Sequence, residues 1–269
     1  MKILDGRELA DYIKERQAKQ VRALRQAWNV FPKLALVVAN DSQVIDTFVR
    51  LKHSYGEDIL VEVTVHKVEQ SVVPELIQEL NGDDSVHAIV LQLPLINTAE
   101  TDKLVNLIAP HKDVDGLGAN SHYVSATATS IDWLLAGYNV TLRDRIIAIV
   151  GNGRLVGAPL AKLWLNGGLN VSVYDSSTPD LKTALRNADI IVTATGTPGL
   201  IQSSMISPGK VVVDAGTASE DGVIVGDISA EVRERQDITI TPEKGGVGPL
   251  TITALFDNVI TAARKTAEG

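Results

Sequence analysis

The chain has 269 residues, which is enough for one large or two ordinary α/β domains, and its formal net charge of −8 disfavours nucleic acid or an anionic membrane surface as a partner. The absence of cysteine excludes disulfides, thiolate nucleophiles and sulfur-ligated metals, and the five histidines form no close helical pair of the kind that binds zinc, so we expect no metal. The sequence has no uncharged apolar stretch as long as a membrane span, and we expect a cytoplasmic protein without membrane contact.

Helical and extended patterns alternate along the first part of the chain. Apolar residues spaced among charged ones predict an amphipathic helix over Asp5–Ala27, capped by Asp5. Further elements are predicted in alternation, with strands over Lys33–Ala39, Ile59–Val65 and His87–Leu91, and helices over Val44–Tyr55, closed by Gly56, over Pro74–Leu80 and over Thr98–Ile108. This alternation is typical of a parallel sheet, in which ligands bind at the carboxyl ends of the strands.

Two of these elements present side chains where a ligand would bind. Phe48 and Lys52 lie four residues apart, so both side chains leave the same face of a predicted helix. Gln92 follows the third predicted strand. Pro94 has no N–H for continued strand pairing, so Gln92 is expected where the strand ends.

A charged turn over residues 110–116 contains Asp113 and Asp115 and ends at Gly116. Two carboxylates two residues apart in a glycine-ended loop usually cap the backbone of the turn. Composition alone therefore favours turn formation over ligand binding at this place. The segment Ser121–Tyr138 is small, polar and then apolar, and we expect it to lead into a second domain.

The second part of the chain is organised around Gly151–Pro159, which reads Gly-Asn-Gly-Arg-Leu-Val-Gly-Ala-Pro. It lies between a strand predicted over Ile146–Val150 and a predicted helix, and glycines in that position let a pyrophosphate approach the N–H groups of the helix start. A second strand, Leu169–Tyr174, ends at Asp175, where an acid accepts hydrogen bonds from the adenosine ribose of a dinucleotide. The third glycine, Gly157, comes one residue later than in the usual fingerprint, and a tight turn without a ligand is the alternative.

The alternation continues to the end of the chain, with a helix over Leu181–Asn187, strands over Asp189–Thr193, Lys210–Val213 and Ile238–Ile240, and a terminal helix from Leu250. Gly196 and Thr217 follow two of these strands, so their loops are expected at the same edge as Gly151. A hairpin-like turn is predicted at Glu220-Asp221-Gly222. Three glycines between two prolines predict a shaped loop over residues 242–249.

Three motifs follow one another around the dinucleotide loop: Leu91-Gln92-Leu93-Pro94-Leu95, Lys112-Asp113-Val114-Asp115-Gly116 and Gly245-Gly246-Val247-Gly248-Pro249-Leu250-Thr251. Together with Gly151–Pro159 and Val225-Gly226-Asp227, they make the chain resemble, over nearly its whole length, the bifunctional methylenetetrahydrofolate dehydrogenase/cyclohydrolases. The resemblance implies oxidation of 5,10-methylenetetrahydrofolate to 5,10-methenyltetrahydrofolate by NAD or NADP. It also implies hydrolysis of that product to 10-formyltetrahydrofolate.

We therefore expect an α/β protein of two α/β lobes with a cleft between them, the second a Rossmann-type dinucleotide-binding domain. Residues 1–120 with 250–269 are expected to form the folate-binding catalytic lobe, and residues 121–249 the NAD(P)-binding lobe. The resemblance implies that Lys52 is the acid/base group, that Gln92 holds its ammonium in place and that Asp115 hydrogen-bonds the pterin ring. It also implies a homodimer.

Further site residues are expected from the resemblance for the substrate and from the strand-end positions described above for the cofactor. Those expected to bind the folate substrate are Phe48, Leu93, Pro94, Gly245, Gly246, Val247 and Pro249. Those expected to bind the cofactor are Gly151, Asn152, Gly153, Arg154, Asp175, Ser176, Gly196 and Thr217.

The chain departs from the family pattern in two places. The family's Tyr-Val-x-x-Lys reads Phe48-Val49-Arg50-Leu51-Lys52, so the lysine is kept and the tyrosine hydroxyl is lost. The family's Pro-Cys-Thr-Pro is replaced by Ser125-Ala126-Thr127-Ala128. Hydrolysis depends on proton transfer, whereas hydride transfer depends mainly on orientation of the two rings. The loss of the tyrosine hydroxyl at Phe48 therefore threatens the cyclohydrolase activity before the dehydrogenase activity.

Several alternatives stay open at this point. Asp175 favours NAD because a carboxylate repels the 2′-phosphate of NADP, but Ser176, Ser177, Thr178 and Arg154 could bind that phosphate. A dehydrogenase with weak cyclohydrolase is one alternative function, and a non-catalytic protein that binds folate or nucleotide is another. An unrelated two-domain dehydrogenase of amino or hydroxy acids is supported only by the generic fold.

Overall fold

The computed structural model describes residues 2–220 and 223–268, and the chain divides into two compact units. Unit 1 comprises Met1–Ala10 and Thr127–Thr251, and unit 2 comprises Asp11–Ala126 and Ile252–Gly269. This division differs from the expected lobes most clearly at the amino terminus. The strand β1 (Lys2–Ile3) pairs in parallel with β11 (Thr239–Ile240), and this pairing ties the first residues to unit 1.

Unit 2 contains a parallel three-stranded sheet in the order β3-β2-β4, formed by β2 (Lys33–Val38), β3 (Glu62–Lys67) and β4 (Ala88–Gln92). Helix α2 (Gln43–Ile59) connects β2 to β3. After the short 3-10 turn η1 (Gln70–Val72), α3 (Val73–Gly82) leads to β4 on the other side of β2. The strand order therefore reverses at β2, and the carboxyl end of β2 is where an open parallel sheet binds ligands.

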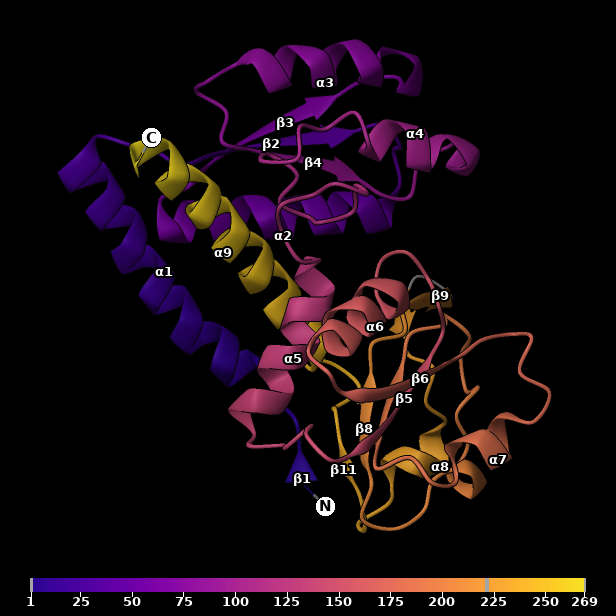
Figure 1. Ribbon diagram of the computed structural model, residues 1–269. Coiled ribbons are helices and arrows are strands. Elements are labelled where there is room, and N and C mark those ends of the chain that lie inside the picture. The colour runs from indigo at the N-terminus through magenta and orange to yellow at the C-terminus, as the bar shows by residue number, and fades with distance from the viewer. Residues whose placement is uncertain (1, 221–222, 269) are drawn as a thin grey trace. The chain divides into compact units, whose positions relative to one another are not determined.

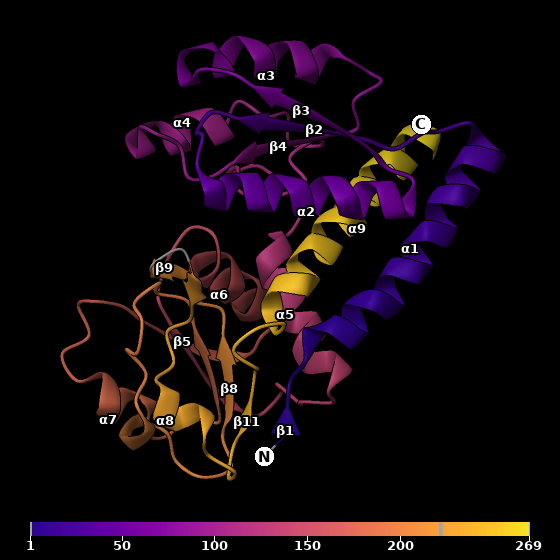
Figure 2. The same ribbon diagram turned by 180° about the vertical axis from the view of Figure 1, so that it is seen from behind.

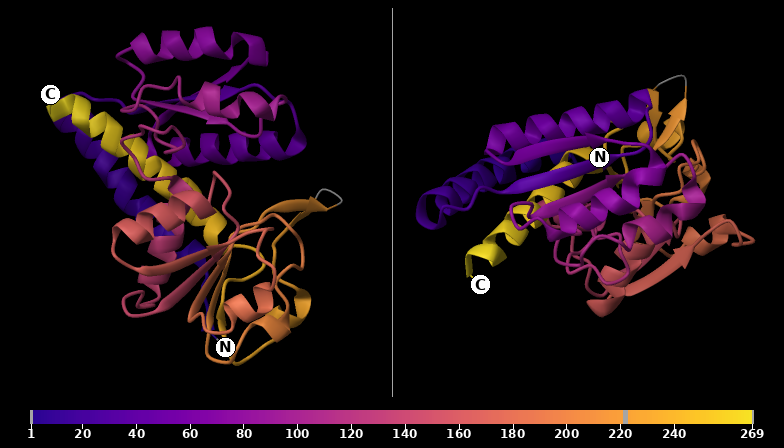
Figure 3. Two further views of the ribbon diagram at one scale, coloured as in Figure 1. Left: turned by 45° about the vertical axis from the view of Figure 1, so that its right-hand side comes forward. Right: turned by 90° about the horizontal axis from the view of Figure 1, so that it is seen from above.

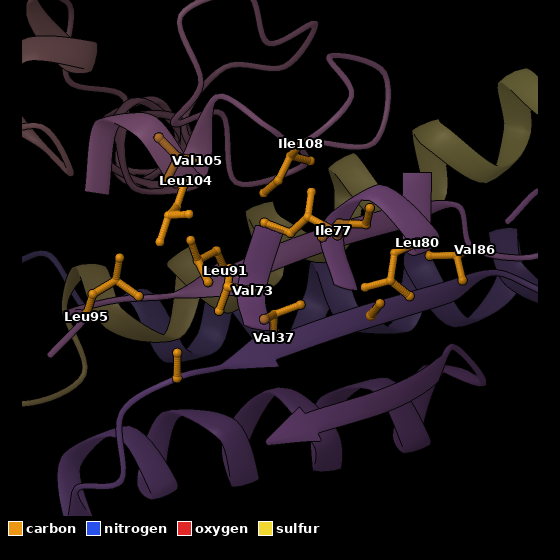
Figure 4. Close-up of a cluster of buried hydrophobic side chains, with 13 residues drawn as sticks. Val37, Val73, Ile77, Leu80, Val86, Leu91, Leu95, Leu104, Val105 and Ile108 are labelled. Carbon is orange, nitrogen blue, oxygen red and sulfur yellow. The ribbon is translucent and has the colours of Figure 1, made fainter. Parts of the chain in front are cut away.

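Helices cover both faces of this sheet, with α2 on one face and α3 on the other (Figure 1). The helix predicted over Thr98–Ile108 is wrong at both ends. Its first three residues form the 3-10 turn η2 (Thr98–Glu100), and the α-helix that follows, α4 (Thr101–Val105), ends three residues before Ile108. Aliphatic side chains from the sheet, α3 and α4 form one buried cluster, in which Val37, Ile77, Leu91 and Leu104 are among the residues drawn in Figure 4. Burial on both faces explains why these strands read as continuous apolar runs.

The sequence predicted that Gly56 closes α2, but the helix continues to Ile59. Leu60 caps it with a left-handed φ of 67°. A Cβ on Gly56 would lie 2.5 Å from a methyl group of Val63 and 3.0 Å from the carbonyl oxygen of Val61. The glycine is therefore required for close packing of α2 against the start of β3. The strand predicted from Ile59 accordingly begins later, at Glu62.

The long helices α1 (Gly6–Trp28) and α9 (Val247–Glu268) lie side by side along much of their length, in indigo and yellow in Figure 3. In unit 2, Gln17 is fully buried between them, and its Nε2 donates to the carbonyl oxygen of Thr253 over 2.9 Å. The Tyr55 hydroxyl donates to Gln17 Oε1 over 2.8 Å. These bonds connect α2, which carries Lys52, to the two long helices.

Unit 1 contains a parallel six-stranded sheet in the order β1-β11-β8-β7-β5-β6. Its further strands are β5 (Ile146–Val150), β6 (Asn170–Tyr174), β7 (Ile190–Thr193) and β8 (Val211–Asp214). Helix α6 (Gly157–Asn166) connects β5 to β6, and the chain then crosses to β7 on the other side of β5. This topology confirms the predicted Rossmann-type domain, with its switch point at the carboxyl end of β5.

Helices α5 (Ala126–Gly137) and α6 lie on one side of this sheet, and α7 (Leu181–Leu185) and α8 (Ala230–Arg233) on the other (Figure 2). Between β8 and α8, the short strands β9 (Ala218–Glu220) and β10 (Val223–Val225) pair in antiparallel fashion. The predicted turn between them includes Asp221 and Gly222, which lie outside the described residues. None of the helices in the described ranges is long and apolar enough to cross a membrane.

Candidate functional site

A lysine and a glutamine are hydrogen-bonded at the carboxyl edge of the sheet in unit 2. Lys52 lies on α2, and its Nζ donates to Oε1 of Gln92 over 2.7 Å. Gln92 is the last residue of β4, is only 7% exposed, and donates through Nε2 to the carbonyl oxygen of Leu93 over 2.9 Å. The side-chain amide is therefore held with its oxygen toward the amine.

Asp115 is brought to the same edge by its chain segment. Asp113 forms a parallel bridge with Ile89 of β4, and the Ile89 N–H donates to the carbonyl oxygen of Lys112 over 2.8 Å. Because this segment runs parallel to β4 from the bridge, it carries Asp115 toward the end of β4, where Gln92 lies.

Lys52 and Asp115 influence each other's protonation. Burial lowers the pKa of Lys52, and the nearby charge of Asp115 opposes that shift. Burial raises the pKa of Asp115, which the charge of Lys52 opposes and that of Asp113 reinforces. Burial thus brings the amine nearer to the neutral form that can accept a proton, while the carboxylate limits the shift.

The neighbouring residues Lys112 and Asp113 anchor the loop that carries Asp115. The Lys112 ammonium donates to three carbonyl oxygens at the end of α3, those of Leu80, Asn81 and Asp83, over 3.0, 3.0 and 2.7 Å. A cation in that position satisfies the last carbonyls of the helix. Asp113 accepts from the N–H of Gly118 over 2.8 Å, so it caps the turn as composition predicted. Asp115 is not needed for that purpose and remains available for a ligand.

The turn after Gln92 is fixed by a residue to which the sequence assigned no role. The Leu93–Pro94 peptide bond is cis, and the Asn40 side chain donates through Nδ2 to the Pro94 carbonyl oxygen over 3.0 Å. Asn40 follows β2 at the switch point, and that position was the available signal. Leu93 packs against the apolar cluster, Pro94 is exposed, and Phe48 is half-buried one helical turn before Lys52.

Close backbone packing within the glycine loop of unit 1 explains why its third glycine is at position 157. Gly151 has a φ of +103°, and a Cβ there would lie 2.5 Å from the carbonyl oxygen of Ala194. A Cβ on Gly157 would lie 1.9 Å from the carbonyl oxygen of Gly151, so the start of α6 packs directly on the end of β5. A Cβ on Gly153 would meet no atom within 4 Å. The backbone at Gly153 is therefore open to a ligand, which fits a bound pyrophosphate.

Asp175 follows β6 on the exposed surface beside this loop. Its Oδ1 accepts from the Ser177 N–H over 2.9 Å and from the Ser177 hydroxyl over 2.5 Å, and these bonds lower the pKa of Asp175. The carboxylate is therefore ionised at neutral pH and suited to accept hydrogen bonds from ribose hydroxyls. Ser176 and Asn152 are also exposed, and Arg154 is half-buried.

Gly196 and Thr217 lie in adjacent loops that follow β7 and β8. Both are exposed, and a Cβ on Gly196, where φ is +67°, would lie 3.3 Å from the carbonyl oxygen of Thr217. Since β7 and β8 are parallel neighbours of β5 in one sheet, these loops share its carboxyl edge with Gly151. The predicted cofactor residues are thus brought to one edge of unit 1.

The glycine-rich loop before α9 also belongs to unit 1, whereas Lys52, Gln92 and Asp115 belong to unit 2. The Gly6 N–H donates to the carbonyl oxygen of Gly245 over 2.8 Å, and Arg7 Nη2 donates to the carbonyl oxygen of Lys244, also over 2.8 Å. The start of α1 therefore holds this loop. The other residues of the loop assigned to the substrate are Gly246, Val247, which is buried, and Pro249, in the first turn of α9.

Comparisons with known proteins cover both units. Residues 4–115 match the family model "Tetrahydrofolate dehydrogenase/cyclohydrolase, catalytic domain", and residues 125–267 match its "NAD(P)-binding domain". A bifunctional protein FolD from Francisella philomiragia is 34% identical over 279 residues, covering 98% of this chain and 99% of that protein.

Two solved structures show the same likeness. The bifunctional enzyme FolD, a methylenetetrahydrofolate dehydrogenase/cyclohydrolase from Campylobacter jejuni, superposes with a TM-score of 0.93 at 33% identity, covering 99% of both chains. The corresponding enzyme of Trypanosoma brucei, complexed with NADP cofactor and an inhibitor, gives a TM-score of 0.92 at 29% identity, covering 99% of this chain and 98% of that one. From these matches and the geometry of its site residues, the chain belongs to the tetrahydrofolate dehydrogenase/cyclohydrolase family.

Proposed function

We propose that this protein oxidises 5,10-methylenetetrahydrofolate to the 5,10-methenyl form with NAD(P) and hydrolyses that product to 10-formyltetrahydrofolate. The observation that carries the proposal is the hydrogen bond from Lys52 to Gln92, beside an Asp115 whose charge acts on the same amine. Family membership of the chain and its coverage by relatives named for both activities support it.

The hydrolysis gives these residues separate tasks. Water adds to the methenyl carbon and must lose a proton, which the neutral amine of Lys52 accepts. The same group then returns that proton to the folate nitrogen whose bond to the carbon breaks, and the hydroxyl of the adduct loses its remaining proton to solvent as the formyl C=O forms. Gln92 accepts one N–H of the amine, which orients its lone pair, and Asp115 is placed to hydrogen-bond the pterin ring.

The oxidation requires less of the protein's own acid and base groups. NAD(P), when bound, supplies the acceptor for the hydride. The residues of unit 1 fit that cofactor: Gly153 leaves the backbone open to a pyrophosphate, and Asp175 is an exposed carboxylate at the end of β6. Their contribution is binding and orientation, on which hydride transfer mainly depends.

The preferred cofactor in this proposal is NAD. The ionised Asp175 repels a 2′-phosphate, and the Ser177 hydroxyl, which could otherwise donate to that phosphate, is already bonded to Asp175. The Thr178 hydroxyl oxygen only accepts, from the Asp175 N–H over 3.1 Å, so its own proton is still free to donate.

The test is incubation with methylenetetrahydrofolate and each nicotinamide cofactor, with methenyl absorbance followed as it forms and decays. Turnover with NAD exceeding that with NADP, followed by decay of the methenyl signal, supports the proposal. Absence of turnover with either cofactor rejects it. Tight binding of folate and nucleotide without turnover would instead support a non-catalytic binding protein.

A dehydrogenase with weak cyclohydrolase is the second candidate, and Phe48 favours it. This residue lies one helical turn before Lys52 on α2 and lacks the hydroxyl that the family's tyrosine supplies. Under this alternative, methenyl product accumulates, and Phe48→Tyr accelerates its decay without changing the rate of its formation. Decay that already matches formation in the unmodified protein would remove this candidate.

The assembly is part of the same proposal and is based on the resemblance alone, whereas the location is based on the sequence pattern. We propose a homodimer in the cytoplasm. Light scattering after size-exclusion chromatography measures the first directly, and a monomer at micromolar concentration would contradict it.

A further inference from the structure

A buried carboxylate outside the assigned site holds the loop that contains Gly196. Asp227 lies between β10 and α8 and is fully buried. Its Oδ2 accepts from the Thr193 hydroxyl and from the Thr195 N–H, each over 2.6 Å, and its Oδ1 accepts from the Thr197 N–H over 2.9 Å. The amides on both sides of Gly196 are therefore directed to one side chain.

A second carboxylate, Asp214 at the end of β8, holds the neighbouring loop. Its Oδ1 accepts from the N–H groups of Gly216 and Asp227, both over 3.1 Å. Its Oδ2 accepts from Arg233 Nη2 over 2.5 Å, an ion pair in which the carboxylate side chain is only 4% exposed. Asp214 thus fixes the residue before Thr217 and also the backbone of Asp227.

The Asp227 carboxylate lies against Gly216, and the Asp214 carboxylate lies against Gly226. A Cβ on Gly216 would lie 2.1 Å from Oδ1 of Asp227, and a Cβ on Gly226 would lie 2.1 Å from Oδ2 of Asp214. Neither glycine accepts a side chain unless a carboxylate moves. The two segments, Asp214 to Gly216 and Gly226 to Asp227, therefore interlock.

Burying two carboxylates costs more desolvation free energy than packing apolar side chains at the same place. The donors to Asp227 are a hydroxyl and two backbone N–H groups, so no opposite charge among them offsets that cost. A carboxylate does what an apolar residue cannot, because it binds backbone N–H groups and thereby sets the direction of the peptide planes. The peptides that Asp227 orients flank Gly196, and one of the N–H groups that Asp214 binds, that of Gly216, directly precedes Thr217.

We propose that Asp227, supported by Asp214, is a positioning residue for the nicotinamide cofactor: it holds the loops of Gly196 and Thr217 in the conformation that binds the dinucleotide. This inference rests on the proposed assignment of those two loops to the cofactor. Asp227 itself has no exposed surface and acts only through the loops.

The test is Asp227→Asn, which keeps the shape of the side chain and loses one acceptor. In either orientation of the amide, its NH₂ faces a backbone N–H, that of Thr195 or that of Thr197, so one of the two bonds is lost. We expect the dissociation constant of NAD, measured by quenching of tryptophan fluorescence, to rise at least about tenfold.

Asp189→Asn is the matched control. Asp189 also accepts a backbone N–H, that of Ile146 over 3.0 Å, and pairs with Lys210 over 3.2 Å, but it lies at the amino ends of β5 and β7. We expect its substitution to lower the melting temperature without changing the dissociation constant of NAD. A change of the same size in both variants would show a purely structural role for Asp227 and overturn the proposal.

A folded Asp227→Asn protein that binds NAD within about threefold of the unmodified protein would also overturn it. If that variant does not fold, Thr193→Val decides, because it removes only the hydroxyl donor to Asp227; we expect about threefold weaker binding, and an unchanged constant refutes the proposal. Because NAD binding is measured without folate, failure of the proposed folate activity would appear separately, as absent turnover in the unmodified protein.

Discussion

Replacing Gln92 by glutamate is a direct perturbation of the proposed acid/base group, because it turns a neutral acceptor into a charged one with little change of shape. Lys52 Nζ and Gln92 Oε1 are 2.7 Å apart. Opposite unit charges at that distance attract by about 6 kcal/mol at an effective dielectric constant of about 20, and about 1.4 kcal/mol corresponds to one pKa unit. Relaxation and partial access of water reduce this effect, so we expect the pKa of Lys52 to rise by at least about 2 units.

The assay is hydrolysis of methenyltetrahydrofolate as a function of pH, after subtraction of the uncatalysed rate. The neutral amine of Lys52 is the form that accepts a proton, so a higher pKa reduces its population at neutral pH. The limb of the profile that follows deprotonation of Lys52 should move up by at least about 2 units, with the rate at pH 7 reduced by about 10-fold to about 100-fold and recovering as pH rises.

Gln92→Met is the control for this experiment. It removes the hydrogen-bond acceptor of Lys52 without adding a charge, so the rate falls but the limb does not move to higher pH. Coincident pH profiles for Gln92→Glu and Gln92→Met would refute the assignment of Lys52 as the group that titrates in catalysis.

Three further substitutions test separate parts of the structure. Lys52→Met should slow hydrolysis by about 100-fold to about 10,000-fold while folate binding at equilibrium persists; the free energy of unfolding should change little, because relief of the ammonium's desolvation offsets the lost bond to Gln92, and loss of folding would contradict this. Gly56→Ala should reduce the free energy of unfolding in urea by about 1 to about 3 kcal/mol, because its Cβ would contact Val63, whereas Gly82→Ala, whose Cβ meets nothing within 4 Å, should not. Asp175→Ser should raise the ratio of kcat/KM for NADP to that for NAD at least about tenfold, and an unchanged ratio would show that another group selects the cofactor.

Most strands could be predicted from the sequence to within one or two residues. Ile146–Val150 is an example, since a strand buried on both faces leaves an unbroken apolar run. The failure at Gly56 has an equally physical cause. Glycine commonly ends a helix, and the sequence pattern does not show that this glycine is required by Val61 and Val63, which pack against α2.

The candidate site was predicted only in part for a similar reason. Gln92 could be placed at a strand end because Pro94 stops the pairing, and Lys52 could be placed on a helix. Composition did not distinguish Asp113 from Asp115, since both fit a glycine-ended turn, and only the family resemblance singled out Asp115. In the structure, the bridge to Ile89 and the bond from the Gly118 N–H assign the capping of the loop to Asp113.

By itself, the sequence determined the alternating α/β architecture, the Rossmann-type topology around Gly151 and the kinds of side chain available for proton transfer, because these follow from local periodicity, turn chemistry and motif order. The tertiary structure alone decided which groups meet. Lys52 bonds Gln92 across 40 residues, and Asp227 bonds Thr193 across 34. Such contacts arise when separate strands and helices pack into one sheet unit, and no local pattern of either segment specifies the partner that burial will bring to it.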